Sequence, residues 1–105
     1  MTTTAILTTW YPKVETYLIE FIDSINNQSD KDFDLLILNN KFKRFSKFKK
    51  TIKDKIKIIE IKSNSKNISL NRIKLIKAAI KKKYKNLIFC DSDDSFTKNR
   101  VKLCK

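Results

Sequence analysis

Residues 87–94 read Leu-Ile-Phe-Cys-Asp-Ser-Asp-Asp, a short apolar run that stops at a cluster of carboxylates. The apolar half predicts a buried strand, and the acidic half follows at its carboxyl end. Such like charges repel one another unless a cation offsets them, so Asp91, Asp93 and Asp94 indicate a site for Mg²⁺ or Mn²⁺ with a phosphate. A second interpretation stays open, in which the aspartates cap a helix over residues 95–103, because Asp and Ser are favoured at helix N-termini.

The residues before this stretch alternate between strand-like and helix-like patterns. Apolar and β-branched runs predict strands at residues 4–8, 33–38, 56–61 and 87–90. Strands that alternate with helices form a mostly parallel sheet with helices on its faces. We therefore expect an α/β fold, and a chain of 105 residues is long enough for a single domain, residues 1–105.

Apolar residues recur at helical spacing in two longer stretches, and each set predicts the buried face of a helix. Residues 12–27 begin with a proline, which suits the first turn of a helix. In that stretch the inward set is Val14, Tyr17, Leu18, Phe21, Ile22 and Ile25. In the basic stretch 69–83 the inward set is Ile73, Ile76 and Ile80.

Residues 41–54 place Phe42, Phe45, Phe48 and Ile52 on one helical face, with lysines around them. Basic residues interleaved with aromatic ones are typical of surfaces that stack on single-stranded nucleic acid. Phenylalanines at this spacing are more often the buried stripe of a helix, and we favour that interpretation. The burial of the rings distinguishes the two.

Lysine dominates the charge of the chain, because Lys and Arg number 24 against 11 Asp and Glu, a formal net charge of +13. This excess suits nucleic acid, an anionic membrane surface or phosphorylated ligands as partners. Only 3 of the basic residues are arginine, the residue expected where phosphates or bases are bound by paired hydrogen bonds. We therefore expect most lysines to lie on a solvated surface, which disfavours a nucleic-acid partner.

The cellular setting is predicted from the cysteines and the N-terminus. Cys90 and Cys104 match no metal-binding spacing, and Cys90 lies in the apolar run, which fits a reducing compartment. Residues 1–4 lack the basic start and long apolar core of a signal peptide, and no apolar run approaches the length of a membrane span. We expect a cytoplasmic protein, and contact with the inner face of the membrane is left open.

Ligands of parallel α/β sheets bind at the carboxyl ends of the strands. The loops expected to meet there lie at residues 8–11, 39–40 and 63–67, beside the acidic residues. The order of motifs resembles the N-terminal half of a family 2 glycosyltransferase with the Rossmann-like GT-A fold, over nearly the whole chain. The motifs that carry the resemblance are Thr9-Trp10-Tyr11, Ser24-Ile25-Asn26-Asn27-Gln28-Ser29, the strand Asp34 to Leu38, Ser69-Leu70-Asn71-Arg72 and the stretch Leu87 to Asp94.

The resemblance implies a site for a nucleotide sugar, the donor in transfer of a sugar to an acceptor. By position, Thr9 and Tyr11 would line the base and ribose, with Asn39 beside the base. Arg72 would approach the diphosphate. The sugar, the base and the acceptor, whether a saccharide or a lipid-linked molecule, are not identified by these residues.

The resemblance also assigns the metal. Asp93 would bind Mn²⁺ or Mg²⁺ directly, and Asp91 would contact the ribose or the metal. A divalent ion that bridges diphosphate oxygens stabilises the charge that develops as the glycosidic bond breaks. The family's general base lies downstream of this motif, so no catalytic residue is assigned here, and the base is expected beyond Lys105. We expect a fragment or remnant that binds the donor without turnover.

Two departures from the family pattern bear on the site. The chain has Asn39 and Asn40 where an aspartate pair is usual, so the carboxylate that would bind the base N–H is absent there. The chain also stops before the acceptor half, which should leave a strand edge and apolar surface uncovered. We therefore expect self-association or a partner at that edge.

Two other classes of protein stay open. A strand that ends in Asp-x-Asp also resembles the nucleophile motif of haloacid-dehalogenase-like phosphatases, in which the first aspartate attacks phosphate. That motif normally opens its domain, whereas Asp91 and Asp93 stand near the end of this chain. A basic module that binds RNA or DNA is the other, and steep salt dependence of oligonucleotide binding would favour it.

Overall fold

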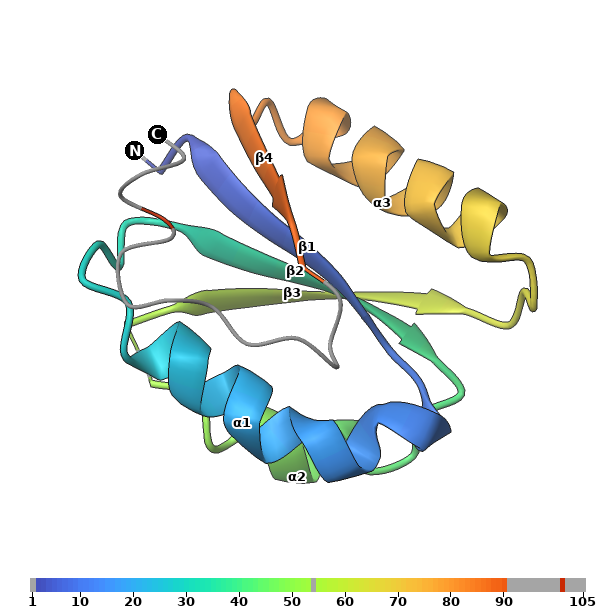
Figure 1. The fold of residues 1–105 in the computed structure, drawn as a ribbon. Helices are drawn as coiled ribbons and strands as arrows, with labels where there is room; N and C mark the ends of the chain where they lie inside the picture. Colours follow the sequence, from blue (N-terminus) through green and yellow to red (C-terminus); the bar gives the residue numbers. More distant parts are fainter. Residues whose placement is uncertain (1, 54, 91–100, 102–105) are drawn as a thin grey trace.

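The computed structural model describes residues 2–53, 55–90 and 101, and these residues form a four-stranded sheet with helices on both faces (Figure 1). All strand pairs are parallel, in the order β3-β2-β1-β4. This arrangement confirms the predicted α/β fold. The elements in chain order are β1 (Thr4–Trp10), η1 (Pro12–Val14), α1 (Glu15–Asn26), β2 (Asp34–Asn40), α2 (Phe45–Lys49), β3 (Lys57–Ser63), α3 (Ile68–Lys81) and β4 (Asn86–Phe89).

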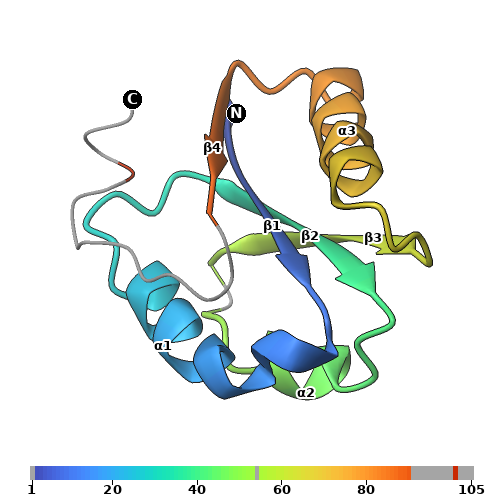
Figure 2. The same ribbon diagram turned by 45° about the vertical axis from the view of Figure 1, so that its right-hand side comes forward.

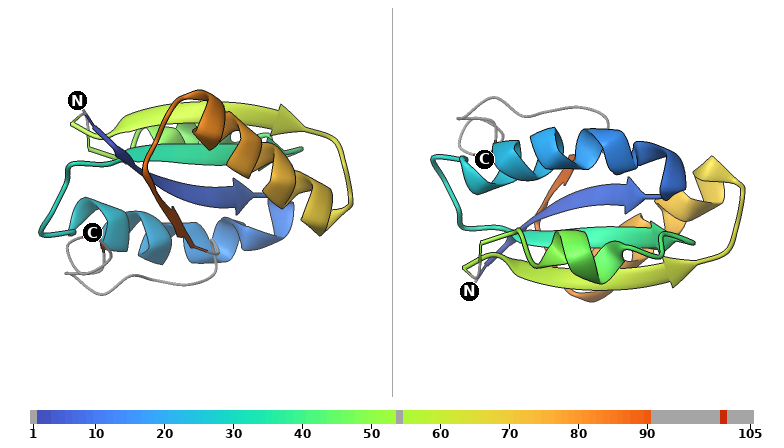
Figure 3. Two further views of the ribbon diagram at one scale, coloured as in Figure 1. Left: turned by 90° about the horizontal axis from the view of Figure 1, so that it is seen from above. Right: turned by 90° about the horizontal axis from the view of Figure 1, so that it is seen from below.

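The helices divide between the two faces of the sheet. Helices α1 and α2 cover one face and α3 covers the other, as the turned views show (Figures 2 and 3). Side chains alternate between the faces along each strand, so Ile6 packs on the α1 side and Leu7 on the α3 side. Because both faces are covered, the central strands have apolar residues on both sides in their middle parts, at Ala5–Leu7 of β1 and Leu35–Leu38 of β2.

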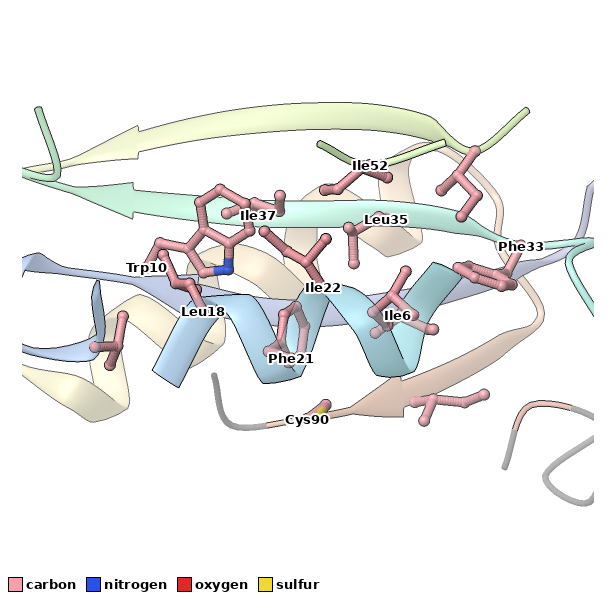
Figure 4. Close-up of a cluster of buried hydrophobic side chains, with 14 of the residues drawn as sticks. Ile6, Trp10, Leu18, Phe21, Ile22, Phe33, Leu35, Ile37, Ile52 and Cys90 are labelled. Atoms are coloured by element: carbon pink, nitrogen blue, oxygen red, sulfur yellow. The ribbon is translucent and has the colours of Figure 1, made fainter. Parts of the chain in front are cut away.

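The larger core lies between the sheet and α1 (Figure 4). Trp10 is fully buried there, and its ring meets Phe42 edge-on with 6.0 Å between centroids and Phe45 at 5.2 Å. Phe48 is partly buried against the same cluster. These contacts confirm the buried stripe in residues 41–54, although only Phe45–Lys49 are α-helical. The phenylalanines are packed into the core, so their rings do not form a surface for stacking on nucleic acid.

The predicted inward face of α3 is wrong for two of its three residues. Ile73 is 45% exposed and Ile80 is 62% exposed, whereas Leu75 and Ala79 are buried against the sheet. Ile76, the third predicted residue, is partly buried in the same cluster. Both sets have helical spacing. The set with Leu75 and Ala79 faces the sheet, because the small side chain of Ala79 allows α3 to pack closely against it.

One residue of the α1 set is also misplaced. Tyr17 is 50% exposed, while Leu18, Phe21 and Ile25 are buried as predicted. Its neighbours fill the core, and its hydroxyl end favours water.

Local signals explain where the elements start and stop. Pro12 opens the 3₁₀ turn before α1, and the Asn67 side chain caps α3 by accepting the Leu70 N–H at 3.1 Å. Lys41 and Lys83 have positive φ values of 60° and 65° and turn the chain after β2 and after α3.

The helix expected over 95–103 lies outside the described residues apart from Val101. No helix in the described part of the chain is long and apolar enough to cross a membrane.

Candidate functional site

The strand register brings the predicted loops to one edge of the sheet. Trp10 pairs with Asn39, and Asn40 pairs with Ser63, so the ends of β1, β2 and β3 lie side by side. On the other side of β1, Leu7 pairs with Phe89, the last residue of β4. The carboxyl ends of the described strands therefore lie together at one end of the sheet, as expected for a parallel sheet. We call this end of the sheet the polar edge.

Thr9 and Asn39 leave this edge on opposite faces. Thr9 follows the alternation of Leu7 toward the α3 side, whereas Asn39 follows Ile37 toward the side of α1 and α2. Tyr11 comes directly after β1 and is 38% exposed, and its carbonyl accepts the Val14 N–H at 3.0 Å. The predicted base-lining residues thus lie around the end of the sheet rather than on one of its faces.

The Asn39 side chain is held at both ends. Its Oδ1 accepts the backbone N–H of Phe42 at 2.8 Å, and its Nδ2 donates to Glu60 Oε2 at 2.8 Å. The first bond stabilises the turn at Lys41, where φ is positive. The second joins β2 to the neighbouring strand β3. Asn39 therefore links the turn after β2 to the neighbouring strand β3.

Asn40 belongs to a second network on the other side of β2. Its Nδ2 donates to the Ser65 carbonyl at 3.0 Å, and Asn71 Nδ2 donates to the same oxygen at 3.0 Å. Asn71 Oδ1 in turn accepts from Ser63 Oγ at 2.7 Å. These bonds tie the β3–α3 loop to the ends of β2 and β3.

The motif assignment gave Asn71 no role of its own, although it is only 5% exposed. Its spacing to Leu75 and Ala79 was the signal that could have found it, because an asparagine on a buried stripe needs polar partners. The hydrogen bonds of Asn71 fix the first turn of α3. They thereby place Arg72, the next residue.

Arg72 reaches across to the edge strand β4. Its guanidinium carbon lies 5.9 Å from the centre of the Phe89 ring, a cation–π distance. Phe89 stands two residues before Asp91 in the sequence. The structure therefore brings the predicted phosphate-binding cation to the end of the strand that leads into the acidic residues.

Asp91 and Asp93 lie outside the described residues, so the structure does not place the predicted metal ligands. Among the described residues, His, Cys, Asp and Glu side chains form no group of three or more that could hold a metal ion. The structure does describe Cys90 and Val101, which stand on either side of these residues in the sequence. Cys90 N–H donates to the Leu7 carbonyl at 3.1 Å, and the buried Val101 N–H donates to Gln28 Oε1 at 3.0 Å.

A comparison with family models matches glycosyl transferase family 2 over residues 5–104. Among solved structures, residues 1–349 of Staphylococcus aureus TarS in complex with UDP match with a TM-score of 0.74 and 18% identity, over 95% of this chain and 30% of that one. The same TarS residues in complex with UDP-GlcNAc match with a TM-score of 0.71 and 17% identity, over 95% and 29%. A further S. aureus TarS structure gives 0.65 and 20%, over 95% and 18%.

These structural matches, each below 25% identity, establish the fold, a Rossmann-like GT-A half-domain. The chain spans less than a third of the length of the solved chains it matches. A comparison with curated proteins found no match.

Proposed function

The chain belongs to glycosyl transferase family 2, and we propose that it binds the nucleotide-sugar donor at the carboxyl edge of its sheet. The observation that carries the proposal is the register that sets the ends of β1 and β2 side by side and pairs β4 with β1, together with Arg72 over Phe89 at the end of β4. The similar TarS structures are complexes with UDP and UDP-GlcNAc, so a uridine diphosphate sugar is the first donor to test. The geometry supplies an aromatic side chain, amides and a cation, which suit a base, a ribose and a phosphate.

Arg72 has the position of a phosphate ligand in this proposal. It is exposed, it sits in the first turns of α3, and Asn71 anchors the backbone beside it. A guanidinium can donate paired hydrogen bonds to phosphate oxygens, and these are strengthened by charge. Its distance to Phe89 keeps the charge near the strand that leads into Asp91.

A divalent ion, Mn²⁺ or Mg²⁺, belongs to the same proposal. Asp91 and Asp93 would hold it, because carboxylate oxygens are the ligands that hard cations prefer. The fit rests on their position: Asp91 follows Cys90, which is hydrogen-bonded to β1 at the edge where the donor would lie. When bound, the ion stabilises the charge that develops on the diphosphate leaving group.

Sugar transfer also needs a general base to activate the acceptor. Residues 95–105 carry no carboxylate, so a base of the family kind does not follow Asp94 within these 105 residues. We therefore expect the 105-residue chain to bind the donor without multiple turnover to an acceptor. The nature of the acceptor is open to either a saccharide or a lipid-linked molecule.

Calorimetric titration of the chain with UDP, with and without Mn²⁺, tests this function. We expect binding that requires the metal and weakens about tenfold in Arg72→Ala, because a charge-assisted hydrogen bond contributes on the order of 1.5–3 kcal/mol. Arg44→Ala is the matched control, since Arg44 is exposed and pairs with Glu15 at 3.3 Å on the surface. Equal affinity in both variants, or no binding by the unsubstituted chain, would contradict the proposal.

A further inference from the structure

Asn39 and Glu60 form a hydrogen-bonded pair, and the proposed function gives Glu60 no role. The Phe42 N–H donates to Asn39 Oδ1 at 2.8 Å, and a backbone N–H can only donate. This bond fixes which end of the amide faces the turn. Nδ2 is then the end that faces β3, where it donates to Glu60 Oε2 at 2.8 Å. The amide orients a carboxylate on the neighbouring strand.

Glu60 presents this carboxylate to solvent near the polar edge. Its side chain is exposed, and it pairs in register with Ile37, so it lies on the same face of the sheet as Asn39. Within residues 2–53, 55–90 and 101, no lysine or arginine forms an ion pair with it. Its negative charge therefore stands beside the predicted base-binding residue, held by an amide rather than neutralised by a cation.

An aspartate at position 39 would not be compatible with this pair. It could still accept the Phe42 N–H, but its other oxygen would face the Glu60 carboxylate and repel it. At position 40 the same logic applies, because Asn40 Nδ2 donates to the Ser65 carbonyl and an ionised aspartate cannot donate. The asparagine pair thus matches the partners that this fold places around it.

We propose that Glu60 is the specificity-determining carboxylate of the donor site, with Asn39 as its positioning residue. Glu60 accepts a hydrogen bond from the N–H of the donor base, the N3–H in the case of uracil. Each polar end of the Asn39 amide already has a partner, so within this pair the charged acceptor is the Glu60 carboxylate. The inference rests on the proposed function, since it needs the donor to bind at this edge.

The test compares UDP with 3-methyluridine 5′-diphosphate, which lacks the N3–H, in calorimetric titrations with Mn²⁺. Glu60→Gln should weaken UDP binding about tenfold, because it replaces a charge-assisted hydrogen bond by a neutral one. The same variant should bind the methylated analogue as the unsubstituted chain does. Glu20→Gln is the control, because it makes the same change at an exposed position of α1.

The double variant Asn39→Asp/Glu60→Gln reverses the pair, so that the glutamine amide donates to the aspartate. It should recover most of the lost UDP affinity, and it decides the matter if Glu60→Gln alone proves unstable in a thermal melt. Unchanged UDP affinity in Glu60→Gln, or equal weakening toward both nucleotides, would refute the inference alone. Failure of the unsubstituted chain to bind UDP would refute the proposed function and this inference together.

Discussion

Gln28 ties the end of α1 to the chain beyond the acidic residues, and its removal should be costly. The side chain is fully buried, its Nε2 donates to the Ser24 carbonyl at 3.0 Å, and its Oε1 accepts the Val101 N–H at 3.0 Å. Gln28→Leu has a similar volume but removes both bonds and leaves the buried Val101 N–H without this acceptor. Each net hydrogen bond contributes about 1 kcal/mol, and an unpaired buried donor costs about 1–3 kcal/mol.

We therefore expect Gln28→Leu to lower the free energy of unfolding by about 2–4 kcal/mol. Urea denaturation followed by circular dichroism measures this, and the midpoint should fall while the m-value stays unchanged. Glu20→Gln on the exposed side of α1 is the control and should change stability by less than about 0.5 kcal/mol. A loss below about 0.5 kcal/mol in Gln28→Leu would show that the bond to Val101 does not stabilise the fold.

Other predictions concern α3, the start of the sheet and its free edge. Leu75→Ala should lower the free energy of unfolding by about 2–4 kcal/mol in urea denaturation, whereas Ile80→Ala, at 62% exposure, should lower it by under about 1 kcal/mol. A larger loss in Ile80→Ala than in Leu75→Ala would contradict the inward face described for α3. Burial and the hydrogen bond to Asp34 raise the pKa of Tyr84. The contribution of Tyr84 to the free energy of unfolding is therefore present below about pH 10 and is lost as pH rises further. Tyr84→Phe should cost about 1 kcal/mol at neutral pH and flatten the alkaline stability profile; an unchanged profile would contradict this. Strand β4 pairs only with β1 among the described strands, and Phe89 is 40% exposed. We therefore expect concentration-dependent self-association in analytical ultracentrifugation. A monodisperse monomer at high concentration would count against this expectation.

The strands and their parallel direction were predictable because they depend on local apolar runs and on general rules of connection. Runs such as Leu35–Leu38 have no polar face, which already indicates a strand buried on both sides. The inward face of α3 was not predictable in the same way. The sets that contain Ile73 and Leu75 both satisfy helical spacing, and only the shape of the opposing sheet distinguishes them.

The candidate site shows the same division. The positions of Tyr11 and Asn39 at the ends of β1 and β2, and of Arg72 near the end of β4, could be predicted from the motif order, whereas their binding of a nucleotide stays a prediction. The partners of these residues depend on register and on contacts between distant segments. The Asn39–Glu60 bond spans 21 residues and the Gln28–Val101 bond spans 73, and no local pattern signals either.

The most direct test of the central claim, metal-dependent binding of a donor nucleotide at this edge, uses the acidic residues themselves. Asp93→Asn should abolish Mn²⁺-dependent binding of UDP in calorimetric titration, because an amide oxygen has no charge to hold a hard cation between protein and phosphate. Asp94→Asn is the matched control and should retain binding, since Asn still caps a helix nearly as well as Asp. Unchanged Mn²⁺-dependent affinity in Asp93→Asn would contradict the account.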